Sequence, residues 1–137
     1  MDAASTPVGI ERFQQVSLPV ADLDRAVSFY RDKVGLRLIA TFDPPGLAFL
    51  DVGGVRLLLS RSKDAKPSSG TLYLRVADID AAERALTTRG VAFEHRPALV
   101  HRDTAGQFGP AGSEEWMAFL RDPDGHLLSI AATKPAR

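Results

Sequence analysis

Few side chains in this sequence could carry out acid–base or metal chemistry. The 137 residues include three histidines and no cysteine. His101 precedes a pair of glutamates, Glu114 and Glu115, by a short stretch of chain. An imidazole and a carboxylate can exchange protons with a substrate near neutral pH, or both can bind a divalent ion. Glu115 and His101 are therefore candidates for a catalytic pair or part of a metal site. The alternative is that both are solvated surface side chains.

Composition excludes several other classes of protein. Without cysteine there can be no disulfide scaffold, thiol nucleophile or cysteine zinc site. Seventeen basic and seventeen acidic residues give a formal net charge of zero, which argues against a nucleic-acid partner. No apolar run approaches the roughly 18 residues that a membrane span needs, and residues 1–9 lack a signal-peptide pattern. We expect a cytoplasmic protein with no membrane partner.

The sequence contains an internal repeat. Val20-Ala-Asp-Leu-Asp24 recurs as Val76-Ala-Asp-Ile-Asp80, and each copy follows a strand-like run, residues 14–20 and 71–76. Each copy also opens a helix-like segment that ends at a glycine, Gly35 or Gly90, where a left-handed C-terminal cap favours this residue. The shared spacing predicts two copies of one structural unit.

Local patterns predict the elements of each unit. Asp22 and Asp78 are typical N-caps, and apolar residues follow them at helical spacing. Strand-like runs come next: residues 36–42, 47–52 and 55–60 in the first copy, and 91–96, 115–121 and 126–131 in the second. Turn sequences such as Gly53-Gly54 and Asp122-Pro-Asp-Gly125 separate them. Each unit is therefore predicted as β-α-β-β-β, in the α+β class.

The units are expected to form one domain over residues 10–132. Module one would span residues 10–62, a polar linker 63–70, and module two 71–132. The stretch 98–113 breaks the symmetry, since it holds three glycines and a proline without a clear period. It is either a loop that covers a site or a disordered surface insertion.

These motifs resemble a known family. The segment from Val20 to Asp24, followed by Phe29-Tyr30 and Gly35-Leu36, resembles the first-module signature of the vicinal oxygen chelate superfamily, which includes glyoxalases, bleomycin-resistance proteins and dioxygenases. Asp122-Pro-Asp-Gly-His126 resembles the hairpin near that family's C-terminus. The resemblance covers about residues 10–132 and implies two tandem β-α-β-β-β modules forming a curved sheet around a cup. It also implies a homodimer, the commonest oligomer.

The resemblance also implies four metal-ligand positions, on the first and fourth strand of each module. Carried over one at a time, they fall on Gln15, Leu58, Thr71 and Ser129. Only Gln15 is a residue that the family uses as a ligand, and leucine cannot bind a metal. We therefore expect no metal and no cofactor. The alternative is one divalent metal ion at a relocated site that includes Glu115 and His101.

Side chains alternate between the two faces of a strand, and this alternation extends the resemblance to the residues that would line the cup. In related fosfomycin-modifying enzymes an aromatic residue three positions before the hairpin lines the cup, and that position is Phe119 here. Met117 and Glu115 then share its face, while Trp116 faces a helix. Phe49 is the repeat equivalent of Phe119, and Tyr73 has the parity of Thr71. The predicted lining, which could equally be a filled core face, is Gln15, Phe49, Leu58, Thr71, Tyr73, Phe119 and Ser129. Of the other histidines, His95 is expected to be partly buried and His126 exposed.

Three functions are compatible with these features. The first is a metal-free protein that binds a small molecule in an apolar cup, as bleomycin-resistance proteins do. The second is a lyase, isomerase or dioxygenase with a relocated metal or with acid–base chemistry through Glu115 and His101. The third is a non-catalytic regulatory or partner module.

Overall fold

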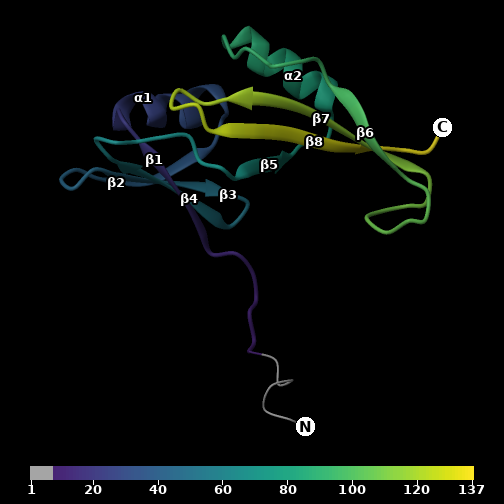
Figure 1. The fold of residues 1–137 in the computed structure, drawn as a ribbon, viewed down its shortest axis with the longest axis horizontal. Helices are drawn as coiled ribbons and strands as arrows, with labels where there is room; N and C mark the ends of the chain where they lie inside the picture. The colour runs from purple at the N-terminus through teal and green to yellow at the C-terminus, as the bar shows by residue number, and fades with distance from the viewer. Residues whose placement is uncertain (1–7) are drawn as a thin grey trace.

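The structure, a computed structural model, describes residues 8–137 and contains the two predicted units (Figure 1). The first unit consists of β1 (Gln15–Val20), α1 (Leu23–Ser28), the π-helix η2 (Phe29–Lys33), β2 (Arg37–Phe42), β3 (Leu47–Val52) and β4 (Val55–Arg61). The second consists of β5 (Thr71–Arg75), α2 (Ile79–Thr88), β6 (Ala98–Asp103), β7 (Ser113–Arg121) and β8 (Leu127–Lys134). The fold is α+β, with two tandem β-α-β-β-β modules, as predicted.

Each module builds its own four-stranded sheet. The strand order is β1-β4-β3-β2 in the first sheet and β5-β8-β7-β6 in the second. In both sheets the first and last strands of the module pair in parallel, and the other pairs are antiparallel. Figure 1 shows α2 lying over one side of β7 and β8, with no helix on the opposite side. We call the side of each sheet that faces away from the helices its open face.

The predicted helix signals hold in both modules. The Asp22 carboxylate accepts a 3.0 Å hydrogen bond from the N–H of Arg25, and Asp78 caps α2 in the same way. Gly35 and Gly90 have φ angles of 90° and 86°, the left-handed conformation that favours glycine. The first helix widens into η2 before it ends.

The core lies between the helices and the helix-facing side of the sheets. Alternate strand residues point into it, which is the period-two pattern of a half-buried sheet. The core includes Leu18, Val20, Leu50 and Leu59 in the first module and Leu120, Leu128 and Ile130 in the second. The residues between these positions lie on the open faces.

The Asp122–His126 hairpin joins the modules. The Tyr30 hydroxyl donates a 2.6 Å hydrogen bond to the Asp122 carboxylate, and the N–H of Ala21 donates to Oδ1 of Asp124 at 2.8 Å. Both acceptors lie in the turn that connects β7 to β8, whereas both donors belong to the first module. The hairpin therefore supplies polar contacts that hold the two sheets in one arrangement.

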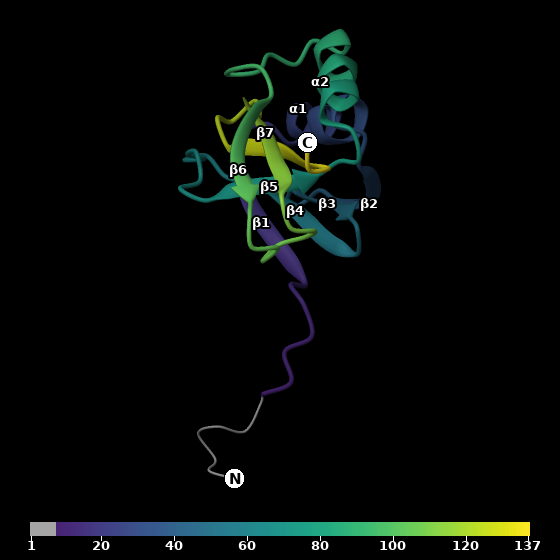
Figure 2. The same cartoon turned by 90° about the vertical axis from the view of Figure 1, so that its right-hand side faces the viewer.

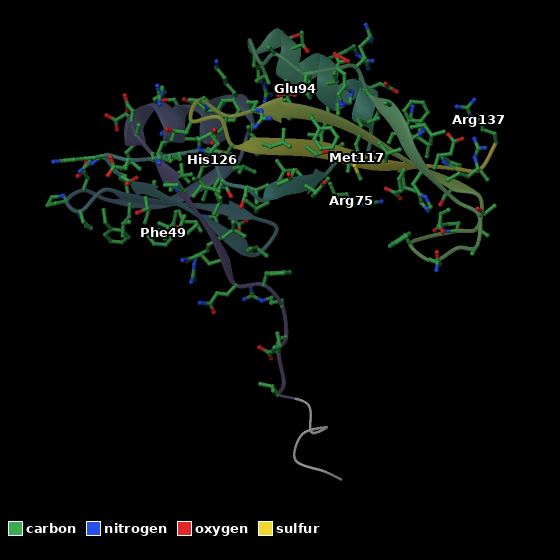
Figure 3. All side chains as sticks on the ribbon, viewed as in Figure 1. Phe49, Arg75, Glu94, Met117, His126 and Arg137 are labelled. Carbon is green, nitrogen blue, oxygen red and sulfur yellow. The ribbon has the colours of Figure 1, made fainter. Side chains whose placement is uncertain are left out.

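The prediction that His126 is exposed is wrong, since only 1% of this residue is exposed. Nδ1 of its ring accepts a 2.7 Å hydrogen bond from the N–H of Ser68, and Nε2 lies 2.7 Å from the carbonyl oxygen of Pro19. Nε2 must carry the proton, because Nδ1 acts as acceptor. Figure 3 shows His126 where the two modules meet. The alternation of side chains along a strand could not reveal that His126 is buried, because both of its hydrogen-bond partners are backbone groups far away in the sequence.

The sixth strand lies later in the chain than predicted. Residues 91–96 make one isolated bridge, Phe93 to Leu120, and β6 begins after Pro97. The alternation of Val91 and Phe93 has another cause: both pack on the core beneath α2. A bulge after Leu99 interrupts the period of β6 and hides the strand from pattern analysis.

The stretch 98–113 is thus half strand and half loop. The buried Asp103 carboxylate accepts hydrogen bonds from the N–H groups of Gln107, Phe108 and Gly109 at 2.8 to 2.9 Å. Burial alone would raise the pKa of Asp103, but these three donors hold it below its ordinary value. Figure 1 shows the loop curling toward the side away from α2, so it borders the open face of the second sheet.

Between residues 8 and 137, no helix has the length and hydropathy to cross a membrane. The expectation that no signal peptide is present concerns residues 1–9, most of which lie outside the described part of the chain.

Candidate functional site

The open face of the second sheet carries an aromatic cluster. Phe119 on β7 lies edge-on to Tyr73 on β5, with ring centroids 6.2 Å apart, and its ring is 5.6 Å from that of His95. Ser129 on β8 is the register partner of both Tyr73 and Phe119 and is fully buried beneath them. Tyr73 is 57% exposed. We expected His95 to be partly buried, and this prediction is wrong, because His95 is exposed. The cluster therefore presents an aromatic surface to solvent.

A polar row crosses the same open face next to this cluster. His101 on β6 is the register partner of Glu115 on β7, which in turn is opposite Thr133 on β8. The Thr133 hydroxyl donates a 2.6 Å hydrogen bond to Glu115, and Arg75 on β5 donates to Thr133 at 3.3 Å. The ring of Phe108 stands edge-on to His101 at 5.9 Å. Strand pairing thus brings the two candidate residues opposite each other. Glu115 nevertheless accepts its hydrogen bond from Thr133 and not from His101.

The two neighbouring glutamates have different environments. Glu114 is buried on the helix side, where it accepts hydrogen bonds from Arg102 at 2.6 Å and from the Trp116 indole at 3.1 Å. The Arg102 guanidinium first, and then the Trp116 N–H, hold the pKa of Glu114 below its ordinary value. Trp116 packs against the core, so its predicted orientation opposite Phe119 is confirmed. Only Glu115 is available on the open face.

The open face of the first sheet is more apolar. Phe49 and Leu58 are register partners on β3 and β4, and Phe42 contacts Phe49 edge-on at 6.0 Å. At the end of this sheet, Gln15 accepts a 3.0 Å hydrogen bond from Nε of Arg56. In Figure 3, Phe49 in the first module and Arg75 in the second both lie below the ribbons, on the side away from α2.

The seven predicted lining residues therefore form two groups. Thr71, Tyr73, Phe119 and Ser129 are neighbours on the second sheet, while Gln15, Phe49 and Leu58 lie on the first. Figure 2, which views the molecule from its end, shows both helices on one side of the strands. Each group belongs to a different open face.

Sequence reasoning missed two members of the polar row, Arg75 and Thr133, and one residue of the first sheet, Arg56. Arg75 follows Tyr73 by two positions and Thr133 follows Ser129 by four, so strand period would have placed both on the predicted face. Arg56 could not be found in this way, because its position beside Gln15 depends on the parallel pairing of β1 and β4.

A sequence model of the Glyoxalase/Bleomycin resistance protein/Dioxygenase superfamily matches residues 12–130. The chain belongs to this superfamily. It is 30% identical to the lactoylglutathione lyase of Haemophilus influenzae over 135 residues, which cover 88% of this chain and 91% of that relative.

Solved structures of the superfamily share the fold. A glyoxalase/bleomycin resistance protein/dioxygenase from Nocardioides has a TM-score of 0.72 and 21% identity, covering 98% of this chain and 91% of its own. A putative glyoxalase family protein from Bacillus anthracis has a TM-score of 0.74 and 15% identity, covering 94% and 100%. The resemblance inferred from the repeat and the hairpin is therefore confirmed for family and fold.

The superfamily's metal-ligand positions do not fit a divalent ion in this member. Leu58 has no donor atom, and the amide oxygen of Gln15 is engaged by Arg56. The Ser129 hydroxyl is buried and donates to a neighbouring backbone carbonyl at 3.2 Å, and Thr71 offers only a neutral hydroxyl. Within residues 8–137, no three His, Asp or Glu side chains are placed to share an ion. No chemistry through a metal follows from these four side chains.

Proposed function

We propose that this superfamily member binds a small organic molecule on the open faces of its sheets, without the metal centre that metal-dependent relatives use. The observation that carries the proposal is the exposed aromatic cluster of Tyr73, Phe119 and His95 beside a hydrogen-bonded polar row. Aromatic walls with a few placed polar groups are the usual composition of a ligand site. The cluster would stack against a planar or apolar part of the ligand, and Arg75 and Glu115 would orient its polar groups.

The proposal includes a homodimer, because one open face alone gives a shallow site. Exposed apolar side chains occur on the first sheet as well, with Ile39 43% and Phe42 53% exposed. Contiguous apolar surface on a folded protein commonly marks an interface or a ligand site. A two-fold dimer would place the face of one copy against the other and enclose the ligand. The zero net charge supports a small-molecule ligand rather than a nucleic acid, and the absence of cysteine is compatible with a cytoplasmic location.

A second candidate function is supported by one specific observation. His101 and Glu115 are opposite each other on adjacent strands, on the open face and next to the aromatic cluster. This pair could exchange a proton with a bound substrate, or supply two ligands of a relocated metal ion. The similarity to a lactoylglutathione lyase supports an enzyme of that general kind. We rank it second because no third donor of the usual type adjoins the pair within the described residues.

Elemental analysis of untagged protein, purified without chelator, tests the metal-free proposal. We expect no stoichiometric Zn, Ni, Mn, Fe or Co, even after incubation with each ion, and no lactoylglutathione lyase activity. A different result would favour the second candidate function, an enzyme. That result is about one equivalent of metal per chain, lost in Glu115→Gln and His101→Asn but retained in Glu94→Gln. Glu94 is a suitable control because its carboxylate is occupied by Arg121.

Ligand binding and assembly need separate measurements. A thermal-shift screen of small aromatic compounds should yield ligands whose stabilising effect decreases in Phe119→Ala and persists in Ile10→Ala, an exposed residue outside both sheets. Light scattering should give the mass of a dimer. Failure of both measurements would favour the non-catalytic partner module.

A further inference from the structure

A cavity lies where the two modules meet. Its volume is about 410 Å³, and its walls come from both sheets and from the π-helix. Tyr30 forms part of one wall. The apolar lining includes Val16, Leu36, Leu57, Leu72, Leu74 and Leu128. Leu57, Leu72 and Leu128 point to the helix side of their strands, whereas Arg56, Thr71 and Tyr73 reach the cavity from the open faces.

The cavity continues along the seam between the modules. An adjoining cavity of about 410 Å³ shares Leu36, Val52 and Leu74 with it and extends to Leu86 on α2. The charged residues that line the two cavities are all arginines: Arg56 in the first, and Arg75 and Arg89 in the second. Among residues 8–137, no aspartate or glutamate lines either cavity. In a chain with equal numbers of acidic and basic residues, this local excess of positive charge favours an anion.

Arg56 is held with its binding groups available. Its Nε donates to the neutral amide of Gln15 at 3.0 Å, and within residues 8–137 its two terminal nitrogens have no hydrogen-bond partner. Arg61 and Arg121 differ: both terminal nitrogens of Arg61 donate to Asp43, and Arg121 pairs with Glu94. A guanidinium that is fixed at Nε and open at its terminal nitrogens can bind a carboxylate through two parallel hydrogen bonds.

We propose that the seam cavity binds an amphipathic monocarboxylate, with its apolar tail between the modules and its carboxylate on Arg56. The leucine-rich walls would bury the tail, and Arg56 at the mouth would select a negative headgroup over a neutral or positive one. Because both modules line the cavity, the ligand would also strengthen their attachment. Tyr73 lines both this cavity and the aromatic cluster, but Arg56 and the leucine walls do not belong to the cluster.

Titration calorimetry with ligands of one tail length tests the proposal. The full-length protein would be titrated with decanoate, 1-decanol and decyltrimethylammonium, each as dispersed monomers. We expect saturable binding of one decanoate per chain, with an affinity about tenfold or more above that of decanol. Decyltrimethylammonium should bind more weakly than decanol. Equal binding of the three ligands, or no saturable binding of decanoate, would overturn the proposal.

Two variants and a control localise the site. Arg56→Gln should reduce the decanoate affinity to that of decanol and leave decanol binding unchanged. Leu72→Phe, which fills the cavity, should weaken both ligands. Arg37→Gln changes an exposed arginine on β2, at the opposite edge of the first sheet, and should change neither. Unchanged decanoate binding in Arg56→Gln, or an equal loss in Arg37→Gln, would refute the assignment. Thermal unfolding of Arg56→Gln should match that of the wild type, since this side chain is exposed.

Discussion

The hydroxyl of Tyr30 donates a 2.6 Å hydrogen bond to Oδ2 of Asp122, 92 residues later in the chain and in the other module. Both side chains are buried. Oδ1 of the same carboxylate accepts hydrogen bonds from the N–H groups of Asp124 and His126. One carboxylate therefore shapes the second-module hairpin and also attaches it to the first module.

Removing the Tyr30 hydroxyl should destabilise the whole domain. We expect Tyr30→Phe to lower the free energy of unfolding by about 1.5–3 kcal/mol, because a buried carboxylate loses a charge-assisted hydrogen bond. Chemical denaturation would measure this change. Tyr73→Phe is the matched control, since Tyr73 is exposed and its hydroxyl has no partner within the described residues. Equal effects of the two substitutions would contradict the role of the Tyr30–Asp122 bond.

The same pair predicts a loss of stability in alkali. Burial first, and then the adjacent Asp122 carboxylate, raise the pKa of Tyr30 well above its ordinary value of about 10. A group whose pKa is raised on folding contributes stability that is complete below its unfolded pKa and declines above it. The wild type should therefore lose its advantage over Tyr30→Phe as pH rises above about 10. Denaturation curves would be recorded for both proteins at neutral pH and above about pH 10. If this linkage is absent, the difference in unfolding free energy between wild type and Tyr30→Phe would be the same at both pH values.

The two hydrogen bonds of the His126 ring should select one tautomer. Since Nδ1 accepts from Ser68 and Nε2 faces the Pro19 carbonyl, we expect the Nε2–H tautomer in long-range ¹H–¹⁵N spectra of the ring. His126→Ala should cost about 2–4 kcal/mol, because it leaves two partly buried backbone groups unpaired and opens a cavity. His95→Ala, at an exposed position, provides the comparison. A mixture of tautomers at neutral pH would contradict the two hydrogen bonds.

Asp103 should control the order of the loop over residues 104–112. Asp103→Asn keeps the shape of the side chain but loses its charge, so we expect faster amide exchange at Gln107, Phe108 and Gly109 and a melting temperature several degrees lower. The wild-type carboxyl has a lowered pKa, so its contribution is complete above the ordinary pKa of about 4 and is lost as pH falls below it. The difference in melting temperature between wild type and Asp103→Asn should therefore become smaller in acid. A gap that stays constant would show that the charge is unimportant.

The internal repeat predicted most of the fold because both copies carry the same local signals for helix caps and strands. Asp22 and Asp78 cap helices in both copies, and the apolar alternation that follows them is enough to assign most strands. The prediction was wrong at residues 91–96, where alternation arises from packing under α2 rather than from a strand ladder. Periodicity records which residues are buried, but not what buries them.

The candidate site was only partly predictable for a related reason. Strand parity placed Phe119, Met117 and Glu115 on one face, and it would also have placed Thr133 there. The partners of His126 and Arg56 are set by contacts between modules or between distant strands, which have no local signature. The pairing of His101 with Glu115 was suggested by chemistry alone, and the register of β6 and β7 brings them opposite each other.

The hairpin between β7 and β8 also makes the two halves of the chain complementary rather than interchangeable. The equivalent turn in the first half, Gly53-Gly54, has no side chains with which to reach its neighbour. Two fragments divided within residues 63–70 would therefore recognise each other, because one carries the acceptors at Asp122 and Asp124 and the other carries their donors. Two intact chains could likewise exchange their second halves and keep every one of these contacts.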